Sequence, residues 1–400
     1  MNNRLKITAL ILALTALFSA CGQPIESVDV PVTEATTTVT ETTETTVPPP
    51  TETTVRVTAA GDNLIHSSIY NQAARRSENG TYDFDYAYEN IEDIIAGELN
   101  ILNQETPVND EFQPATYPCF CSPTQLGDKM IDLGFNAFNH ANNHILDKGT
   151  KGVIATLDYW GTKEDIAVCG AYRDKADMDS ISTLTINDIT FSFLGFTEHT
   201  NGLRIPDDSE VEIIYTSEKE VIEEQIKKAR EISDVVVVSV HWGVENSQTV
   251  INAQRILGQD MADWGADIII GTHPHVIQSM EEITAADGRN VLVAYSLGNF
   301  ISAQSVNDRM IGGVLDFEVT KQYSDNSISI DNIKFIPVVT HYDYNYSNVR
   351  VYSLDKYSPE LASQHGVNSQ SPFSYDFIIK TLEKNIDEKY LVLPEELPKE

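Results

Sequence analysis

Residues that can bind a metal ion follow several apolar stretches of this sequence, each at the point where the stretch ends. Asp62 follows RVTAAG, and Glu105 follows ILNQ. His241 follows VVVVSV, and the pair His273 and His275 comes after DIIIGT. Because ligands of open α/β sheets bind at the carboxyl ends of the strands, we expect these side chains to lie close together. Carboxylates and imidazoles without thiolates suit Mn, Fe or Zn, so the pattern predicts a divalent-metal site.

The stretch FNHANNHILDKG, residues 138–149, adds more metal-capable groups. Asn143 and His144 follow an apolar run, as Asn299 does after VAYSLG. A helix cap or a turn would use Asn143 and His144 equally well, and that alternative stays open. His66 and His140 fit the strand-end pattern less well, and we interpret them as structural or as neighbours of the ligand residues.

Each signal taken alone has a simple structural alternative. A Gly-Asp pair such as the one that contains Asp62 is typical of a turn, and His241 could be a histidine satisfied within the core. The segment GTHPH is more specific, although a surface turn remains its alternative. Pro274 stiffens the chain between His273 and His275, and residues two apart in an extended chain point the same way, so both rings could reach one site.

The charge of the chain excludes one class of partner. Its 27 basic and 60 acidic residues give a formal net charge of −33. Nucleic-acid binding depends on basic groups that release counterions from phosphates, so we expect no nucleic-acid partner. A pocket that binds cations is compatible with this charge.

The N-terminus has the pattern of an export signal, which we assign to residues 1–21. Two basic residues precede an apolar run that ends at Phe18, and two small residues then lead to Cys21. The run is short for a transmembrane helix. The stretch LFSACG resembles a bacterial lipoprotein signal, in which the cysteine, here Cys21, is lipidated; plain secretion is the alternative. Lipidation would anchor the protein at the extracytoplasmic face of the cell membrane.

Residues 22–54 are rich in Thr, Pro and Glu and contain no basic residue. Such a segment buries too little apolar surface to offset the entropy lost on ordering. We expect a disordered, extended stalk that holds the folded part away from the membrane.

Residues 55–400 are expected to form one α/β domain. Strand-like runs alternate with helical patterns, which predicts helices packed over a sheet. The strand-like runs lie at 55–62, 100–105, 166–171, 191–196, 234–243, 266–275 and 290–300, and the helical patterns at 86–98, 123–134, 150–163, 217–232 and 252–264. Ser217 and Glu220 have capping-box spacing. After about residue 311 strands dominate, which indicates extra antiparallel strands, with one more helix at 372–388.

Three cysteines follow Cys21 in the chain, namely Cys119, Cys121 and Cys169. They permit at most one disulfide and leave a free thiol. With no CxxC pair, a structural zinc–thiolate site is not expected.

As a set, the motifs resemble those of the CapA-type family, whose members are associated with poly-γ-glutamate capsule synthesis. The motifs are GD at 61–62, NQETP at 103–107, NHANNHILDKG at 139–149, HWGVE at 241–245, GTHPHVIQ at 271–278 and YSLGNF at 295–300. The family is similar to calcineurin-like metallophosphoesterases. The resemblance therefore implies a metallophosphoesterase-like four-layer α/β/β/α sandwich with one or two metal ions.

The resemblance also implies roles for single residues. The metal ligands would be Asp62, Glu105, Asn143, His241, His273 and His275. His144 would stabilise a transition state or protonate a leaving group, Asp147 would orient His144, and Asn299 belongs to the family's own SLGNF motif. Metallophosphoesterases have a histidine two residues after the first aspartate, whereas this chain has Leu64, so one metal position is expected to be weaker or filled by another group such as His66.

Three functions are compatible with the sequence. The first is a membrane-anchored, extracytoplasmic protein that acts in synthesis or export of poly-γ-glutamate or a related surface polymer. Its partners would be the anionic polymer or its precursor and membrane proteins of capsule synthesis. The second is a metal-dependent phosphoesterase acting on an exported phosphate ester, and the third is a non-catalytic polymer-binding lipoprotein. The enzymatic alternatives imply a metal-dependent hydrolase or transferase.

Overall fold

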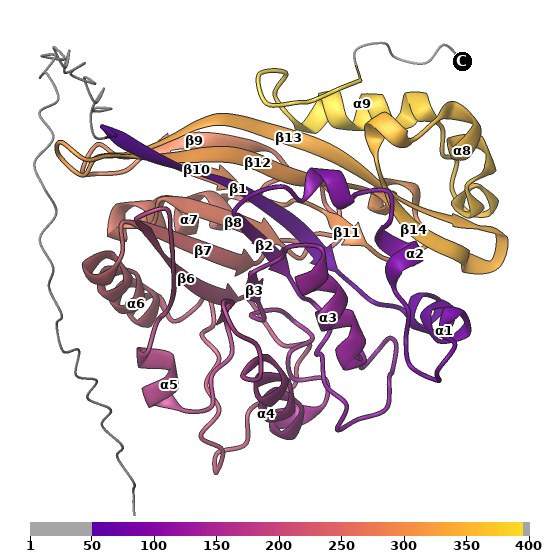
Figure 1. Cartoon of the computed structure of the whole chain (residues 1–400), viewed down its shortest axis with the longest axis horizontal. Helices are drawn as coiled ribbons and strands as arrows, with labels where there is room; N and C mark the ends of the chain where they lie inside the picture. Colours follow the sequence, from indigo (N-terminus) through magenta and orange to yellow (C-terminus); the bar gives the residue numbers. More distant parts are fainter. Residues whose placement is uncertain (1–49, 395–400) are drawn as a thin grey trace, which may run out of the picture. The chain divides into compact units, whose positions relative to one another are not determined.

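The first of two β-sheets carries the start of the folded chain at its centre (Figure 1). The computed structural model describes residues 50–394. Strands β1 to β4 are mutually parallel, and β12 to β14 extend the sheet with antiparallel pairs, in the order β14-β13-β12-β1-β2-β3-β4, while β11 pairs with β1. Their bounds are β1 Glu52–Asn63, β2 Leu99–Asn103, β3 Ala137–Asn139, β4 Ala167–Cys169, β11 Asn299–Ile301, β12 Ile311–Gln322, β13 Ile328–Asp343 and β14 Ser347–Ser353.

The second sheet has the order β5-β6-β7-β8-β10-β9. Strands β6, β7, β8 and β10 are parallel, and the two outermost strands pair antiparallel with them. Their bounds are β5 Ser182–Ile186, β6 Ile189–Thr197, β7 Val235–His241, β8 Ile268–Thr272, β9 Met280–Thr284 and β10 Asn290–Ala294. The antiparallel strands expected after residue 311 are therefore present, and they belong to the first sheet.

Both faces of the second sheet are buried, which explains why its strands read as continuous apolar runs. Val235 and Val237 of β7 belong to the same core cluster as Val55 and Val57 of β1, so the two sheets pack face to face. The alternate residues of β7, beginning with Val236, pack in a second cluster with helices α6 (Lys219–Ile232) and α7 (Asn252–Trp264).

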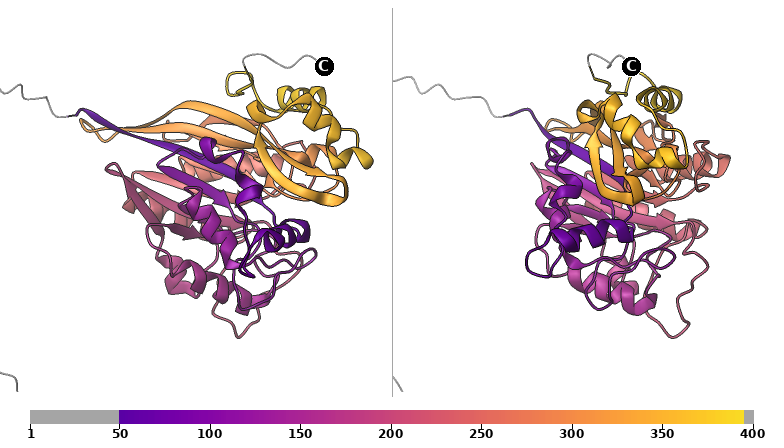
Figure 2. Two further views of the ribbon diagram at one scale, coloured as in Figure 1. Left: turned by 45° about the vertical axis from the view of Figure 1, so that its right-hand side comes forward. Right: turned by 90° about the vertical axis from the view of Figure 1, so that its right-hand side faces the viewer.

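Helices complete the outer layers, as the rotated views show (Figure 2). Helices α3 (Thr124–Asp132) and α4 (Gly149–Trp160) lie against the first sheet, where the rings of Trp160 and Phe138 have centroids 4.2 Å apart. The layers therefore run helix, sheet, sheet, helix. The predicted α/β/β/α sandwich is confirmed.

Further helices lie in the remaining connections and near the C-terminal end of the described chain. They are α1 Ser67–Arg76, α2 Asp85–Tyr88, η1 Glu92–Ile94, α5 Lys175–Asp179, η2 Asn307–Met310, η3 Tyr344–Tyr346, η4 Leu354–Lys356, α8 Pro359–Gln364, η5 Gly366–Ser369 and α9 Tyr375–Asn385. Helix α9 lies within the segment 372–388 that the sequence predicts to be helical, whereas β14, α1 and α8 were not expected.

Two local predictions are wrong. The helix expected at 86–98 is only α2 and η1, because Asn90 forms a bridge with Tyr352 and draws the chain out of helical geometry. The capping box of Ser217 and Glu220 does not form either. Helix α6 begins at Lys219, and the side chain of Glu218 instead accepts a hydrogen bond from the backbone of Tyr215 at 2.8 Å.

The boundaries of the folded unit differ slightly from the expected ones. The compact unit begins at Pro50, and β1 begins at Glu52, so the last residues of the expected stalk belong to a strand. The expected signal peptide, Cys21 and the rest of the stalk lie outside the described residues. Within residues 50–394, no helix is both long and apolar enough to span a bilayer, and Cys119, Cys121 and Cys169 are free thiols.

Candidate metal centre

The ends of strands from both sheets meet at one place. Asp62 stands at the end of β1, in register with Asn103 of β2 and Asn299 of β11. His241 ends β7 beside Thr272, the last residue of β8. The backbone N–H of His273 then points at the Oδ1 atom of Asp62, 3.4 Å away, so the two sheets contribute to a common site.

A buried triad forms the first group of candidate ligands. Asp62, Glu105 and His275 each offer a ligand atom, and these atoms all lie within 4.8 Å of one another. The Nδ1 atom of His275 is 3.0 Å from Asp62 Oδ2, and its Nε2 atom is 3.7 Å from Glu105 Oε1. Asn103, which the sequence reading missed, donates from Nδ2 to Asp62 Oδ1 at 2.8 Å and so orients that carboxylate.

A second group surrounds His241. Its Nε2 atom lies 3.1 Å from Asn143 Oδ1, 3.1 Å from His273 Nδ1 and 3.7 Å from Glu105 Oε1. Thr272, a further residue that the sequence reading missed, lies 3.0 Å from the other ring nitrogen of His241 through its Oγ1 atom. Glu105 therefore contacts both groups, as a ligand shared by two ions would.

The electrostatics of these groups fit a bound cation. Both carboxylate oxygens of Glu105 are buried and have no hydrogen-bond partner among the described residues. Burial and the nearby charge of Asp62 raise the pKa of Glu105 well above its usual range. A buried carboxylate is costly unless it is paired or coordinates a metal ion. A divalent ion would supply the missing partner for Glu105.

The histidines differ in protonation because their neighbours differ. Burial and the neighbouring His273 hold the pKa of His241 well below its usual range, and burial lowers the pKa of His273 to about 3. Burial also lowers the pKa of His275, but Glu105 and Asp62 outweigh it and raise that pKa to about 9. His241 and His273 are thus neutral, which is the form of imidazole that binds metals.

The paired histidines reach the site by an unexpected backbone path. His273 has φ = 97° and His275 has φ = 59°, both in the left-handed region. The extended geometry inferred from the sequence is therefore wrong, although both rings do reach the site. Such conformations are strained for residues with a side chain and persist where the surroundings hold them.

His144 lies beside the metal ligands and is held by Asp147. Its Nδ1 atom is 2.8 Å from Asp147 Oδ2, which also accepts a hydrogen bond from the backbone N–H of Phe120 at 2.6 Å. Asn143, His144 and His275 all line one cavity of about 700 Å³. The predicted orientation of His144 by Asp147 is present, next to a space that could hold a substrate.

The other predicted residues lie near the site without joining it. Leu64 and His66 line the cavity, but His66 is not one of the triad residues, and its Nδ1 atom accepts a hydrogen bond from the N–H of Ala303 at 3.2 Å. His140 is buried against Trp160, with ring centroids 5.6 Å apart.

Asn299 holds the backbone around the ligands. Its Nδ2 atom donates to the carbonyl oxygens of His275 and Arg309 at 3.3 and 3.0 Å. Asn299 is therefore placed to position a ligand-bearing loop through its amide nitrogen, while its Oδ1 atom is buried without a hydrogen-bond partner among the described residues.

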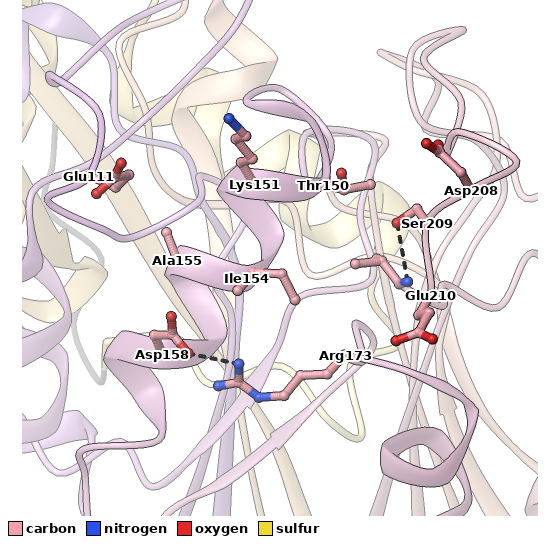
Figure 3. Close-up of a pocket in the computed structure, with 11 residues that line it drawn as sticks. Glu111, Thr150, Lys151, Ile154, Ala155, Asp158, Arg173, Asp208, Ser209 and Glu210 are labelled. Atoms are coloured by element: carbon pink, nitrogen blue, oxygen red, sulfur yellow. Dashed lines mark hydrogen bonds and ion pairs between the residues drawn. The ribbon is translucent and has the colours of Figure 1, made fainter.

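A cavity of about 630 Å³ beside α4 holds none of the predicted site residues (Figure 3). Arg173 in this cavity is paired with Asp158 at 2.7 Å. Three further carboxylates line it, from Glu111, Asp208 and Glu210. It is therefore an acidic surface cavity apart from the candidate metal centre.

The fold and the site together define an α/β/β/α protein with a candidate divalent-metal centre at its strand ends. Residues 56–304 match the family described as "Bacterial capsule synthesis protein PGA_cap", and the chain belongs to this family. The CapA-type resemblance of the motifs is thus confirmed.

Two curated relatives carry the same designation. The chain is 34% identical over 248 residues to the PGA biosynthesis protein CapA of Bacillus subtilis (strain 168), covering 61% of this chain and 62% of that protein. It is 30% identical over 233 residues to the capsule biosynthesis protein CapA of Bacillus anthracis, covering 56% of this chain and 55% of that protein. The chain thus matches less than two thirds of the length of either relative.

Two solved structures show more distant likeness. A phosphatase of Mycoplasma pneumoniae aligns with a TM-score of 0.45 and 11% identity, over 72% of this chain and 94% of its own. A protein described as a 5′-nucleotidase of Staphylococcus aureus aligns with a TM-score of 0.40 and 14% identity, over 70% of this chain and 54% of its own.

Proposed function

We propose that this protein acts in the synthesis or export of poly-γ-glutamate or a related anionic surface polymer, by means of a bound divalent metal. The observation that carries the proposal is Glu105, whose two buried oxygens have no hydrogen-bond partner among the described residues although they lie where two groups of ligand residues meet. Membership of the capsule synthesis family supports the polymer as the material on which the site acts.

The donor atoms define where metal would bind and which ions suit the site. Asp62, Glu105 and His275 would hold one ion. Asn143, His241 and His273 would hold a second, with Glu105 shared between the two. Nitrogen and oxygen donors without thiolates favour Mn, Fe or Zn. When bound to these residues, such an ion would supply Lewis-acid chemistry toward an amide or phosphoryl oxygen.

His144 is the group placed to move a proton. Asp147 holds its Nδ1 side at 2.8 Å, which leaves the opposite nitrogen for the cavity. A histidine fixed in this way acts as a general acid or base toward a bound substrate. This arrangement suits a hydrolase or transferase.

Elemental analysis of the purified protein tests the metal proposal. We expect at least one equivalent of Mn, Fe or Zn per chain, and a loss of most of it in His273→Ala and His275→Ala. His365→Ala, which removes a buried histidine that bonds to Thr340 and Val367, is the matched control and should keep its metal. Only trace metal in the wild-type protein would exclude the proposed chemistry.

Phosphoester hydrolysis is the second candidate reaction. The placement of His144 and Asp147 beside two ligand groups favours this reaction. Leu64 argues against it, because metallophosphoesterases have a histidine at this place and the first group therefore has one potential ligand fewer than theirs. If it is correct, the metal-loaded protein hydrolyses an aryl phosphate, and Asn143→Ala abolishes the hydrolysis. A role in holding polymer without catalysis would instead show as normal polymer production in a strain that carries His144→Ala.

We also propose that the protein is anchored at the extracytoplasmic face of the cell membrane by lipidation of Cys21. The charged and apolar N-terminal segment and the small residues before Cys21 support this location. Anchoring would bring the site close to membrane proteins of capsule synthesis and to the growing polymer. Cys21→Ser should move the protein from the membrane fraction to the soluble fraction; retention in the membrane would exclude the lipid anchor.

A further inference from the structure

Arg309 lies in the wall of the cavity beside the candidate metal centre. The cavity of about 700 Å³ is also lined by Asn143, His144 and His275. Of the described residues that line it, Arg309 is the only arginine or lysine. Arg309 lies after the end of the family match, residues 56–304, and outside the motifs on which the family resemblance rests.

The guanidinium of Arg309 forms no hydrogen bond or ion pair with the described residues, although its charge acts on the neighbouring carboxyl group of Asp308. Its Nε atom is buried without a hydrogen bond, and Arg309 forms no ion pair, although Asp308 precedes it in the chain. In a chain with 60 acidic residues, an arginine left unpaired inside a cavity calls for an explanation. A ligand that carries anionic oxygens would satisfy it.

The backbone of Arg309 is fixed relative to the metal ligands. The side-chain amide of Asn299 donates to the carbonyl oxygen of Arg309 at 3.0 Å and to that of His275 at 3.3 Å. Upstream, the hydroxyl of Tyr342 donates to the carbonyl oxygen of Gln304 at 2.8 Å. The amide of Asn299 thus connects the backbone of Arg309 to the loop that carries His275. This connection fixes the position of the Arg309 backbone before any substrate binds.

We infer that Arg309 binds an anionic oxygen group of the substrate and thereby positions the neighbouring bond at the metal centre. The inference rests on the proposed function and specifies its substrate class. A guanidinium forms two parallel hydrogen bonds with a carboxylate or a phosphate. In a γ-linked glutamate chain that group is the free α-carboxylate of each unit, and in a phosphate ester it is the phosphate.

The net charge of the protein favours a local cation wherever an anionic substrate binds. The protein carries a formal charge of −33 and would repel an anionic polymer from most of its surface. The cavity beside α4 is a poorer site for an anion, because its Arg173 is paired with Asp158 and its other cation, Lys151, shares the lining with the carboxylates of Glu111, Asp208 and Glu210 (Figure 3).

Calorimetric titration of the full-length, Mn-treated protein tests the inference. The probes are γ-linked triglutamate, the same peptide with its α-carboxylates amidated, and inorganic phosphate. Arg309→Gln removes the positive charge. Arg309→Lys keeps the charge but lacks the planar guanidinium that forms two parallel hydrogen bonds. The control is Arg75→Gln, which removes the same charge from an exposed arginine of a neighbouring cavity.

We expect Arg309→Gln to weaken binding of triglutamate about 10- to 100-fold, with Arg309→Lys intermediate and Arg75→Gln close to wild type. The amidated peptide should bind weakly to every variant. If phosphate loses affinity and triglutamate does not, the anionic group is a phosphate. Equal losses in Arg309→Gln and Arg75→Gln, unchanged binding in Arg309→Gln, or no binding of either anion to the wild type would each overturn the inference.

Metal content, measured on the same samples, separates this inference from the proposed function. Arg309→Gln should keep the wild-type amount of metal, since Arg309 offers no ligand atom. Wild-type protein without metal would refute the proposed metal centre even if Arg309 binds anions. If the metal-loaded protein binds anions equally well with and without the Arg309 side chain, only the inference about Arg309 is refuted, and the proposed metal centre stands.

Discussion

Glu105 is the residue on which the proposed metal binding depends most. Its oxygens are buried and have no hydrogen-bond partner among the described residues, and the pKa of its carboxyl group is raised by burial and by Asp62. Without metal this arrangement costs free energy, because a buried polar group without a hydrogen bond is destabilising by about 1–3 kcal/mol. In the proposed metal-bound state, the same oxygens would be ligands. Glu105 thus lowers the stability of the metal-free protein, and its proposed role is to bind a metal ion.

Glu105→Gln should therefore separate stability from metal binding. The substitution keeps the shape and removes the charge, so the bound metal should fall by at least about tenfold while the melting temperature in chelator does not fall. Elemental analysis and thermal unfolding with and without chelator measure the two effects. Glu111→Gln, in the acidic cavity beside α4, should change neither quantity. A large loss of stability in chelator would show that Glu105 has a structural partner.

His365 shows how burial, aided by the nearby His341, lowers the pKa of a histidine. Its Nε2 atom lies 2.8 Å from the carbonyl oxygen of Thr340, and its Nδ1 atom accepts a hydrogen bond from the N–H of Val367 at 3.0 Å, so the ring is neutral. Burial lowers its pKa from 6.5 to about 3. Because the unfolded chain binds the proton more tightly, the stabilisation is complete above about pH 6.5 and is lost as pH falls toward about 3.

Between pH 7 and pH 5 we expect His365 to contribute a loss of up to about 2 kcal/mol in the free energy of unfolding. His365→Gln keeps a donor toward Thr340 and removes the titration, so its stability should fall less over this interval. Denaturant unfolding at the two pH values measures the difference. Identical pH dependence in both proteins would show that His365 is already protonated in the folded state.

At the scale of elements, the strand ends of β7 and β8 bring the histidines into position. Gly271 lets β8 approach β10 closely, since a Cβ atom at this position would lie 2.0 Å from the backbone oxygen of Tyr295. Two residues later the chain enters the left-handed turn of His273. The geometry of the paired histidines therefore depends on a close contact between strands.

Gly271→Ala should displace the end of β8. We expect it to destabilise the fold by about 1–3 kcal/mol and to lower metal occupancy, because the backbone of β8 must move away from Tyr295. Gly288→Ala is the control: it lies in a turn where a Cβ atom meets nothing within 4 Å, although its φ of 91° makes some loss of stability expected. Its metal content should remain that of the wild type. Normal metal binding in Gly271→Ala would show that the strand end adjusts without moving the histidines.

At the scale of the whole molecule, β1 is the strand that joins the parallel and antiparallel halves of the first sheet. It pairs with β12 from Glu52 to Ala60 and with β2 from Val57 onward. Val55 and Val57 are fully buried between the sheets. The end of this same strand carries Asp62, so the first sheet and the candidate metal centre share one strand.

A chain shortened to begin at residue 50 should keep the stability of the full-length protein. One that begins at residue 58 should lose at least about 3 kcal/mol, because it lacks both buried valines and their strand pairing. Thermal unfolding of the two shortened chains distinguishes them. Equal stability would mean that the first half of β1 contributes little to the sheet.

The layers and many strands followed from local patterns in the sequence. Helix α7 has the expected bounds, and the apolar runs became buried strands, because periodicity reports which face of an element is covered. The helix expected at 86–98 failed, since the bridge of Asn90 to distant Tyr352 outweighs local propensity.

The sequence by itself determined which groups stand at the strand ends, because ligand types and apolar runs are local features that can be read in order. Only the tertiary structure decided that Glu105 touches both ligand groups, that Asn103 and Thr272 orient them, and that Arg309 faces the cavity. Those relations join residues from separate strands and loops. They depend on how two sheets pack and how loops fold back, which no local pattern encodes.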